Sequence, residues 1–338
     1  MTFDQLIQNL KNQIYHPVYL LHGDEAYYID SISDYIEEHV LTETEKEFNQ
    51  TILYGRDVDA PTIVNYAKRY PMMANYQVLI VKEAQEVKDL EALTAYVQKP
   101  LSSTLLVLCH KYGKVDKRKS LAKAVDKHGV LFESPRIYDN KIPGWIETYV
   151  TQRKYSISAK ACFMLTEFLG TDLSKITNEI QKLIINIPHG TEIDEVFVEK
   201  YIGISKDFNV FELQKALGAK HVFKANQIIS YFGSNPRENP LVKVIPILFS
   251  FFSKVLLYQH LQDKSRNNAA SVLAVHPFFL QDYENTARNY SSAKVKSIIG
   301  MLREYDLKSK GVDNVSATDG ELMKELIYRI LHERGSSL

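Results

Sequence analysis

Short apolar runs alternate with stretches of helical periodicity over the first part of the chain. The runs are four or five residues long and begin at Val18, Thr51, Val78, Thr104 and Gly129. Such runs, bounded by glycine, proline or polar residues, are typical of strands buried on both faces of a parallel sheet. The alternation of strands and helices predicts an α/β domain whose sheet is covered on both sides.

Helical spacing alone governs the chain from Ile142 onward. It predicts four short helices up to Tyr201, a polar break at 203–209, and a larger all-α region up to Leu338. The most apolar stretch, 241–261, carries two lysines and a proline, so we expect a core helix of a helical domain and no membrane span. The predicted fold class is therefore α/β plus all-α.

Composition adds few constraints. Lysine plus arginine equals aspartate plus glutamate at 41 each, so any partner recognised by charge must meet a local patch. Cys109 and Cys162 have no CxxC spacing, and the first residues, MTFDQLIQNL, lack the features of a signal peptide. We therefore expect a cytoplasmic protein with reduced core thiols.

The stretch 18–28, VYLLHGDEAYY, has the frame of a phosphate-binding loop: a buried strand, a glycine turn and then an amphipathic helix. The chemistry of that loop is missing. A phosphate loop needs several glycines, a lysine and a serine or threonine, whereas Gly23 is followed here by Asp24 and Glu25. Two carboxylates would repel a triphosphate, so the sequence predicts an NTPase-like scaffold without catalysis.

Other catalytic or metal-binding patterns are missing as well. The ten histidines form no HxH or HExxH pattern, and no GxSxG pattern occurs. Where an NTPase carries its acidic metal-binding pair, Val81 is followed by Lys82 and Glu83. We expect no catalytic residues, no cofactor and no metal.

A basic segment follows the fourth apolar run. It holds five cationic residues, Lys111, Lys114, Lys117, Arg118 and Lys119. Loops after parallel strands gather at the edge of the sheet where ligands bind, so a nucleic-acid backbone is one candidate partner. A solvated helix start, relieved by neighbouring aspartates, explains the same residues equally well.

Two adjacent methionines, Met72 and Met73, follow Pro71. The proline ends the preceding helical pattern and biases Tyr70 away from helical geometry. Because neighbouring side chains point in different directions, we expect at least one methionine to be hard to bury in its own domain, and methionine suits an irregular apolar groove on a partner. The alternative is that both fold back under the sheet as gap-fillers.

Several segments, in order, resemble a known family. They are YLLHGDEAYYIDSISDYI, PMMANYQVLIVKEAQ, TLLVLCHKYGKVDKRKSLAKAV, GTDLSKITNEIQKL, YDLKSKGVD and DGELMKELIYRIL. Together they span nearly the whole chain, which resembles the delta subunit of the bacterial DNA polymerase III clamp loader.

The resemblance implies three domains: a RecA-like AAA+ domain without a functional phosphate loop at 1–138, a helical lid at 139–208 and a helical collar at 209–338. It implies a non-catalytic wrench subunit that binds and opens the sliding clamp, joins the other loader subunits in a hetero-pentamer through the collar, and meets primed DNA only within the assembled loader.

In this family a pair of large apolar side chains enters the pocket of the clamp. The resemblance assigns that contact to Pro71, Met72 and Met73, with two methionines where some relatives have a Leu-Phe-like pair. Two alternatives stay open: an ATP-hydrolysing AAA+ protein with an unrecognised site, and a free-standing DNA-binding protein that uses the basic segment.

Overall fold

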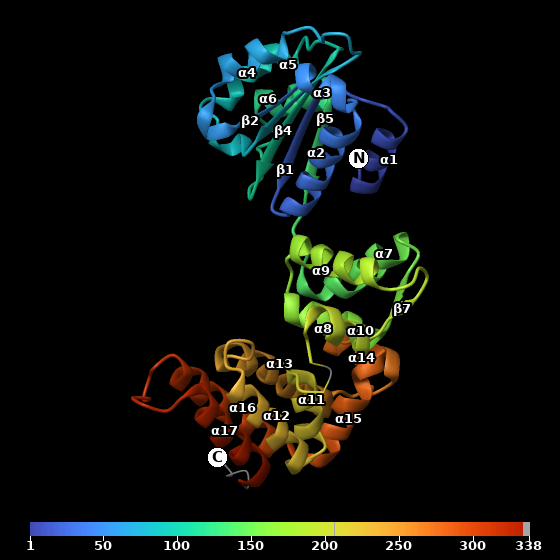
Figure 1. Cartoon of the computed structure of the whole chain (residues 1–338). Helices are drawn as coiled ribbons and strands as arrows, with labels where there is room; N and C mark the ends of the chain where they lie inside the picture. Colours follow the sequence, from blue (N-terminus) through green and yellow to red (C-terminus); the bar gives the residue numbers. More distant parts are fainter. Residues whose placement is uncertain (206, 334–338) are drawn as a thin grey trace. The chain divides into compact units, whose positions relative to one another are not determined.

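The chain forms two compact units, Met1–Tyr138 and Asp139–Leu338, in a computed structural model that describes residues 1–205 and 207–333 (Figure 1). Each unit has its own hydrophobic core. The further division of the second unit into lid and collar at residue 209 stays a prediction.

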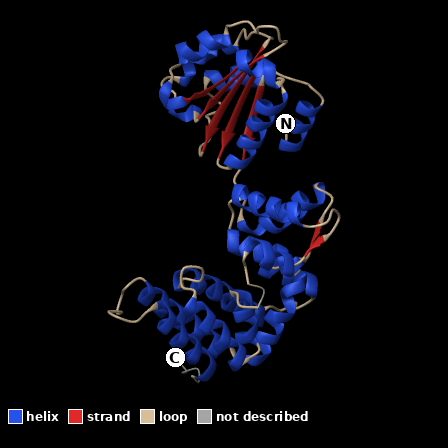
Figure 2. Cartoon of the chain, in the orientation of Figure 1, coloured by secondary structure: helices blue, strands red, loops and turns tan. Residues whose placement is uncertain are grey.

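A five-stranded parallel sheet forms the centre of the first unit, in the order β2-β3-β4-β1-β5 (Figure 2). The five predicted strands are confirmed. Their bounds are β1 Val18–Gly23, β2 Gln50–Tyr54, β3 Gln77–Lys82, β4 Thr104–Lys111 and β5 Val130–Ser134. Every residue of β1 is buried because this strand lies between β4 and β5, which explains its uninterrupted apolar run.

Side chains alternate between the two faces of the sheet, so each face has its own core. On one face, Tyr19 and Leu21 of β1 belong to a buried cluster with residues of α1 (Phe3–Lys11) and α2 (Ala26–His39). On the other face, Val18 and Leu20 belong to a second cluster. The elements that complete it are α4 (Ala60–Ala67), η3 (Leu90–Leu93), α5 (Thr94–Val97) and α6 (Ser120–His128).

Two further turns of 3-10 helix lie in the first unit, η1 (Gly55–Asp57) and η2 (Ala84–Glu86). A third, η4 (Asp139–Lys141), begins the second unit. A further helix, α3 (Glu43–Asn49), precedes β2. Thr42 and Glu45 form a capping box there, in which the side chain of Glu45 accepts from the backbone N–H of Thr42 at 2.8 Å. Asp59 caps α4, because its side chain accepts from the Thr62 N–H at 2.9 Å.

The second unit begins with the four helices expected from the sequence, α7 (Ile142–Gln152), α8 (Ala159–Leu169), α9 (Leu173–Asn186) and α10 (Glu195–Ile202). The expectation that no strand follows residue 142 is wrong. Two short parallel strands, β6 (Ser156–Ile157) and β7 (Glu192–Ile193), pair between these helices. Two residues are too few to show a period of two, so their sequence carries no strand signal.

Seven further helices and one 3-10 turn complete the described part of this unit. They are α11 (Val210–Gly218), α12 (Val222–Ser234), α13 (Leu241–His260), α14 (Arg266–Leu273), η5 (Pro277–Phe279), α15 (Leu280–Asn289), α16 (Ser292–Ser309) and α17 (Asp319–His332). A loop, residues 235–240, joins α12 to α13. Helix α16 ends at Ser309, and residues 310–318 connect it to α17.

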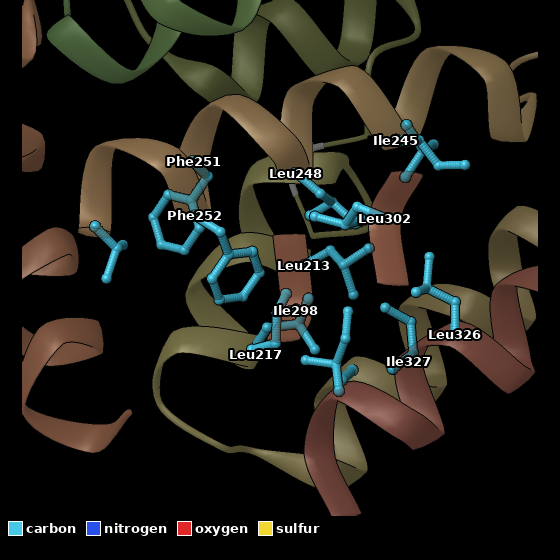
Figure 3. Packing of buried hydrophobic residues seen from close by; sticks show 14 of the residues in the cluster. Leu213, Leu217, Ile245, Leu248, Phe251, Phe252, Ile298, Leu302, Leu326 and Ile327 are labelled. Carbon is cyan, nitrogen blue, oxygen red and sulfur yellow. The ribbon is translucent and has the colours of Figure 1, made fainter. Parts of the chain in front are cut away.

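Helix α13 is the most apolar element, and by length and composition it is the one described helix that could cross a membrane. In this unit it is a core helix. Leu248 and Phe252 are fully buried and lie in one cluster with Leu213 of α11, Leu302 of α16 and Leu326 of α17 (Figure 3). The expected role of α13 as a core helix is therefore confirmed.

Candidate functional site

The turn after β1 lies where a phosphate loop would lie, and it is closed by its own chain. Gly23 has a φ of +138°, and a Cβ at this position would lie 2.1 Å from the carbonyl oxygen of Ser134 at the end of β5. The Asp24 N–H donates to that carbonyl at 3.0 Å, and the Ser134 hydroxyl donates to the Glu25 carbonyl at 2.6 Å. These groups bond to β5 in place of a phosphate.

A carboxylate occupies the start of the following helix. Glu25 is the N-cap of α2, and its Oε1 accepts from the Tyr27 N–H at 3.2 Å. The N-terminus of a helix attracts anions because its N–H groups are unpaired and its dipole is positive there. Here the chain supplies that anion itself, which disfavours a bound triphosphate.

Lysines lie at the ends of two strands, β3 and β4, and the end of β3 is where an NTPase would hold its metal. Lys82, the last residue of β3, pairs with Glu37 of α2 at 3.2 Å, and Lys111, the last residue of β4, pairs with Asp30 of the same helix. Within 1–205 and 207–333, no group of three or more His, Cys, Asp or Glu side chains is placed to hold a metal ion.

Two histidines, the buried His22 and the half-buried His110, were missed by sequence reasoning. They face each other in the register of β1 and β4, and Nδ1 of His22 accepts from the Val115 N–H at 3.3 Å. Burial lowers the pKa of both imidazoles, which favours their neutral form. His22 thus anchors the start of the basic segment to the sheet. No spacing in the sequence could have joined these residues, because the strand register brings them together.

The basic segment is largely paired with acids of its own chain. Glu133 of β5 accepts both Lys117 at 2.7 Å and Lys114 at 3.0 Å, and these two lysines lower the pKa of Glu133 to about 2. The basic segment that follows β4 is therefore tied to β5 by two ion pairs.

The other three residues of the basic segment differ in whether an acid pairs with them. Arg118 pairs with Asp116 at 2.8 Å and remains highly exposed, Lys111 is paired to α2, and Lys119 is exposed at the start of α6. Exposed ion pairs are weak, so a phosphate could replace Asp116 or Glu133 as a partner. The local acids reduce the net charge that such a phosphate would meet.

The two methionines lie on a loop, residues 70–76, between α4 and β3; we call it the methionine loop. Met72 is 63% exposed and Met73 fully exposed. The expectation that at least one is hard to bury is confirmed, and the alternative that both fill gaps under the sheet is wrong. Met73 also has a φ of +54°, which is uncommon for a residue with a side chain.

The base of the methionine loop is anchored, although its tip is exposed. Ala74 and Tyr76 pack against the core formed with α1 and α2, and the ring of Tyr76 meets that of Tyr15 edge to face at 5.4 Å. Pro71 is partly buried and Tyr70 is exposed. The loop thus presents an apolar tip from a fixed base, at the end of the sheet where β3 begins.

Asn49, the last residue of α3, is a further residue that sequence reasoning missed. Its side chain is buried, its Oδ1 accepts from the Met72 N–H at 2.6 Å, and its Nδ2 donates to the Met72 carbonyl at 2.9 Å. A sequence separation of 23 residues gives no local signal for this contact. The preceding residue, Phe48, is exposed, so α3 adds apolar surface next to this contact.

Comparisons with known proteins find relatives that match both units of the chain. The family model described as "DNA polymerase III, delta subunit" matches residues 19–134, and the model of its C-terminal domain matches residues 207–325. DNA polymerase III subunit delta of Bacillus subtilis is 27% identical over 346 residues, which cover 99% of this chain and 98% of that protein.

A solved structure shows the same fold. The DNA clamp loader delta protein of Bacillus subtilis matches with a TM-score of 0.57 and 24% identity, over 98% of this chain and 100% of that one. The two family models together match most of the chain, one in each unit. The chain belongs to the DNA polymerase III delta-subunit family.

Proposed function

We propose that this chain is a non-catalytic clamp-loader subunit that binds the sliding clamp through Pro71, Met72 and Met73 and holds one interface of the ring open. The observation that carries the proposal is the exposed methionine pair on an anchored loop. Contiguous apolar side chains exposed on a monomer mark sites of interaction with a partner, and flexible methionine side chains fit an apolar pocket on such a partner.

The closed turn after β1 supports the non-catalytic part of the proposal. The N–H of Asp24 and the carboxylate of Glu25 are engaged within the chain, and the lysines at the ends of β3 and β4 are paired with acids of α2. Binding a nucleotide would require breaking these bonds and bringing a triphosphate next to Asp24 and Glu25. In the assembled loader, neighbouring subunits hydrolyse the ATP.

The partners follow from the same role. We propose that the chain meets the sliding clamp with its first unit and the other loader subunits, in a hetero-pentamer, with the collar at 209–338. Exposed apolar residues on collar helices, such as Phe223, Phe249 and Tyr328, are candidates for that assembly surface. The buried core around α13 holds the collar together and leaves these residues outside.

The experiment that tests the proposal is a titration of the purified clamp with the purified chain in the absence of nucleotide. Stoichiometric binding supports the proposal. An ATP-hydrolysing protein with an unrecognised site would instead bind and turn over nucleotide by itself. A free-standing DNA-binding protein would bind DNA with a steep salt dependence and leave the clamp unbound.

The basic segment has a narrower role in this proposal, as a DNA contact made only within the assembled loader. Reversing Lys117, Arg118 and Lys119 to Glu is expected to weaken binding of primed DNA by the loader and to flatten its salt dependence, because each lost phosphate contact removes about one unit of slope. The measurement is DNA affinity at several salt concentrations. Lys175→Glu, at an exposed lysine of α9, is the control. An unchanged slope in the triple variant would show that the segment is only a solvated helix start.

A further inference from the structure

We propose that Asn49 is a positioning residue, which fixes the backbone of Met72 and so presents the methionine pair to the clamp. The inference rests on the proposed clamp-binding role of the loop. Part of the clamp affinity that the methionines provide would then depend on a buried polar side chain of α3, outside the methionine loop.

The side-chain amide of Asn49 bonds to both main-chain groups of Met72, as a neighbouring strand would. The amide of Asn49 accepts from the N–H of Met72 at 2.6 Å and donates to its carbonyl at 2.9 Å, so both main-chain groups of one residue are held by one side chain. The amide is held in turn, because its Nδ2 also donates to the Glu45 carbonyl of its own helix at 3.0 Å. Asn49 is 2% exposed, so water does not compete freely for these bonds.

Only an amide satisfies this arrangement. The site needs an acceptor toward the Met72 N–H and a donor toward the Met72 carbonyl, and Asn carries both on one planar group. An aspartate at 49 would place a second oxygen against the carbonyls of Met72 and Glu45, which repels them. Alanine would leave the main-chain groups of Met72 without this partner.

The loop needs such a partner because its conformation is not one that the chain favours alone. Met73 has a φ of +54°, in the left-handed region, directly after the residue that Asn49 holds. Fixing Met72 lets Met73 keep this conformation while both side chains stay exposed. A loop that is ordered before binding loses less conformational entropy when the partner covers it.

A double-mutant cycle with the clamp tests this inference. Asn49→Ala and Asn49→Asp are each placed in the wild type and in the Met72→Ala/Met73→Ala variant, and clamp affinity is measured for all. We expect the Asn49 substitutions to weaken binding about 10-fold in the wild type and less than about twofold in the methionine variant. A purely structural role would weaken both backgrounds equally, and that result would overturn the inference.

Two further measurements test the contact itself and the specificity of the effect on clamp affinity. Hydrogen exchange should show the Met72 amide protected in the wild type and fast in Asn49→Ala; slow exchange in the variant would contradict the proposed contact. Ser33→Ala, at another buried polar side chain of the first unit, should leave clamp affinity unchanged. Normal clamp binding by the Met72→Ala/Met73→Ala variant would contradict the proposed function and, with it, the role of Asn49. Weak binding by that variant together with normal binding by the Asn49 variants would contradict the role of Asn49 alone.

Discussion

Replacing Met72 and Met73 together by alanine is expected to weaken binding to the sliding clamp by about 2–4 kcal/mol, or roughly 30- to 900-fold. The side chains are already exposed in the free chain, so truncation removes contact with the partner and little contact with the core. The midpoint of thermal unfolding should change by less than about 2 °C.

The two quantities must be measured on the same proteins, by calorimetric titration and by thermal unfolding. Ile185→Ala is the matched control, because it removes an exposed apolar side chain from α9 in the second unit. It should alter neither quantity. A methionine variant that melts much earlier but binds the clamp as tightly as the wild type would show that these residues stabilise the fold and do not contact the clamp.

Gly23→Ala is expected to destabilise the first unit by about 3 kcal/mol and to lower its unfolding midpoint by roughly 10 °C. Gly23 has a φ of +138°, and its added Cβ would lie 2.1 Å from the Ser134 carbonyl oxygen. The position of the Cβ is fixed by the backbone and the oxygen is a backbone atom, so no side-chain rotation can relieve the overlap. The turn and the end of β5 must separate, which breaks the hydrogen bonds between Ser134 and the turn.

The control for this substitution is Gly144→Ala in α7, where the added Cβ would meet open space beyond the backbone of its own helix. Alanine favours a helix over glycine, so this variant should be as stable as the wild type or more stable by up to about 1 kcal/mol. Chemical denaturation followed by circular dichroism measures both. A Gly23→Ala protein of wild-type stability would mean that the turn does not approach β5 in the way described.

The strands of the first unit could be predicted because their burial leaves a direct mark on the sequence. A strand such as β1, covered on both faces, needs apolar residues at every position, and the run Val18–Leu21 has that pattern. The missing phosphate chemistry at Gly23, Asp24 and Glu25 was equally readable, since it depends on residue types in a local order.

Long-range contacts could not be predicted in the same way. Asn49 and Met72 meet only after β2 and β3 have paired, and an asparagine in a helical stretch carries no sign of a distant bond. The basic segment shows the same limit. Its charges are visible in the sequence, but the pairing of Lys114 and Lys117 with Glu133 depends on β5 lying next to β1.

The most direct test of the clamp-binding role is a calorimetric titration of the purified clamp with the purified chain, without nucleotide and again with MgATP. The closed turn after β1 and the exposed methionine loop predict saturable binding with the same affinity in both conditions. Failure to bind the clamp without nucleotide, or an affinity that rises more than about 10-fold with MgATP, would contradict a non-catalytic clamp-binding subunit.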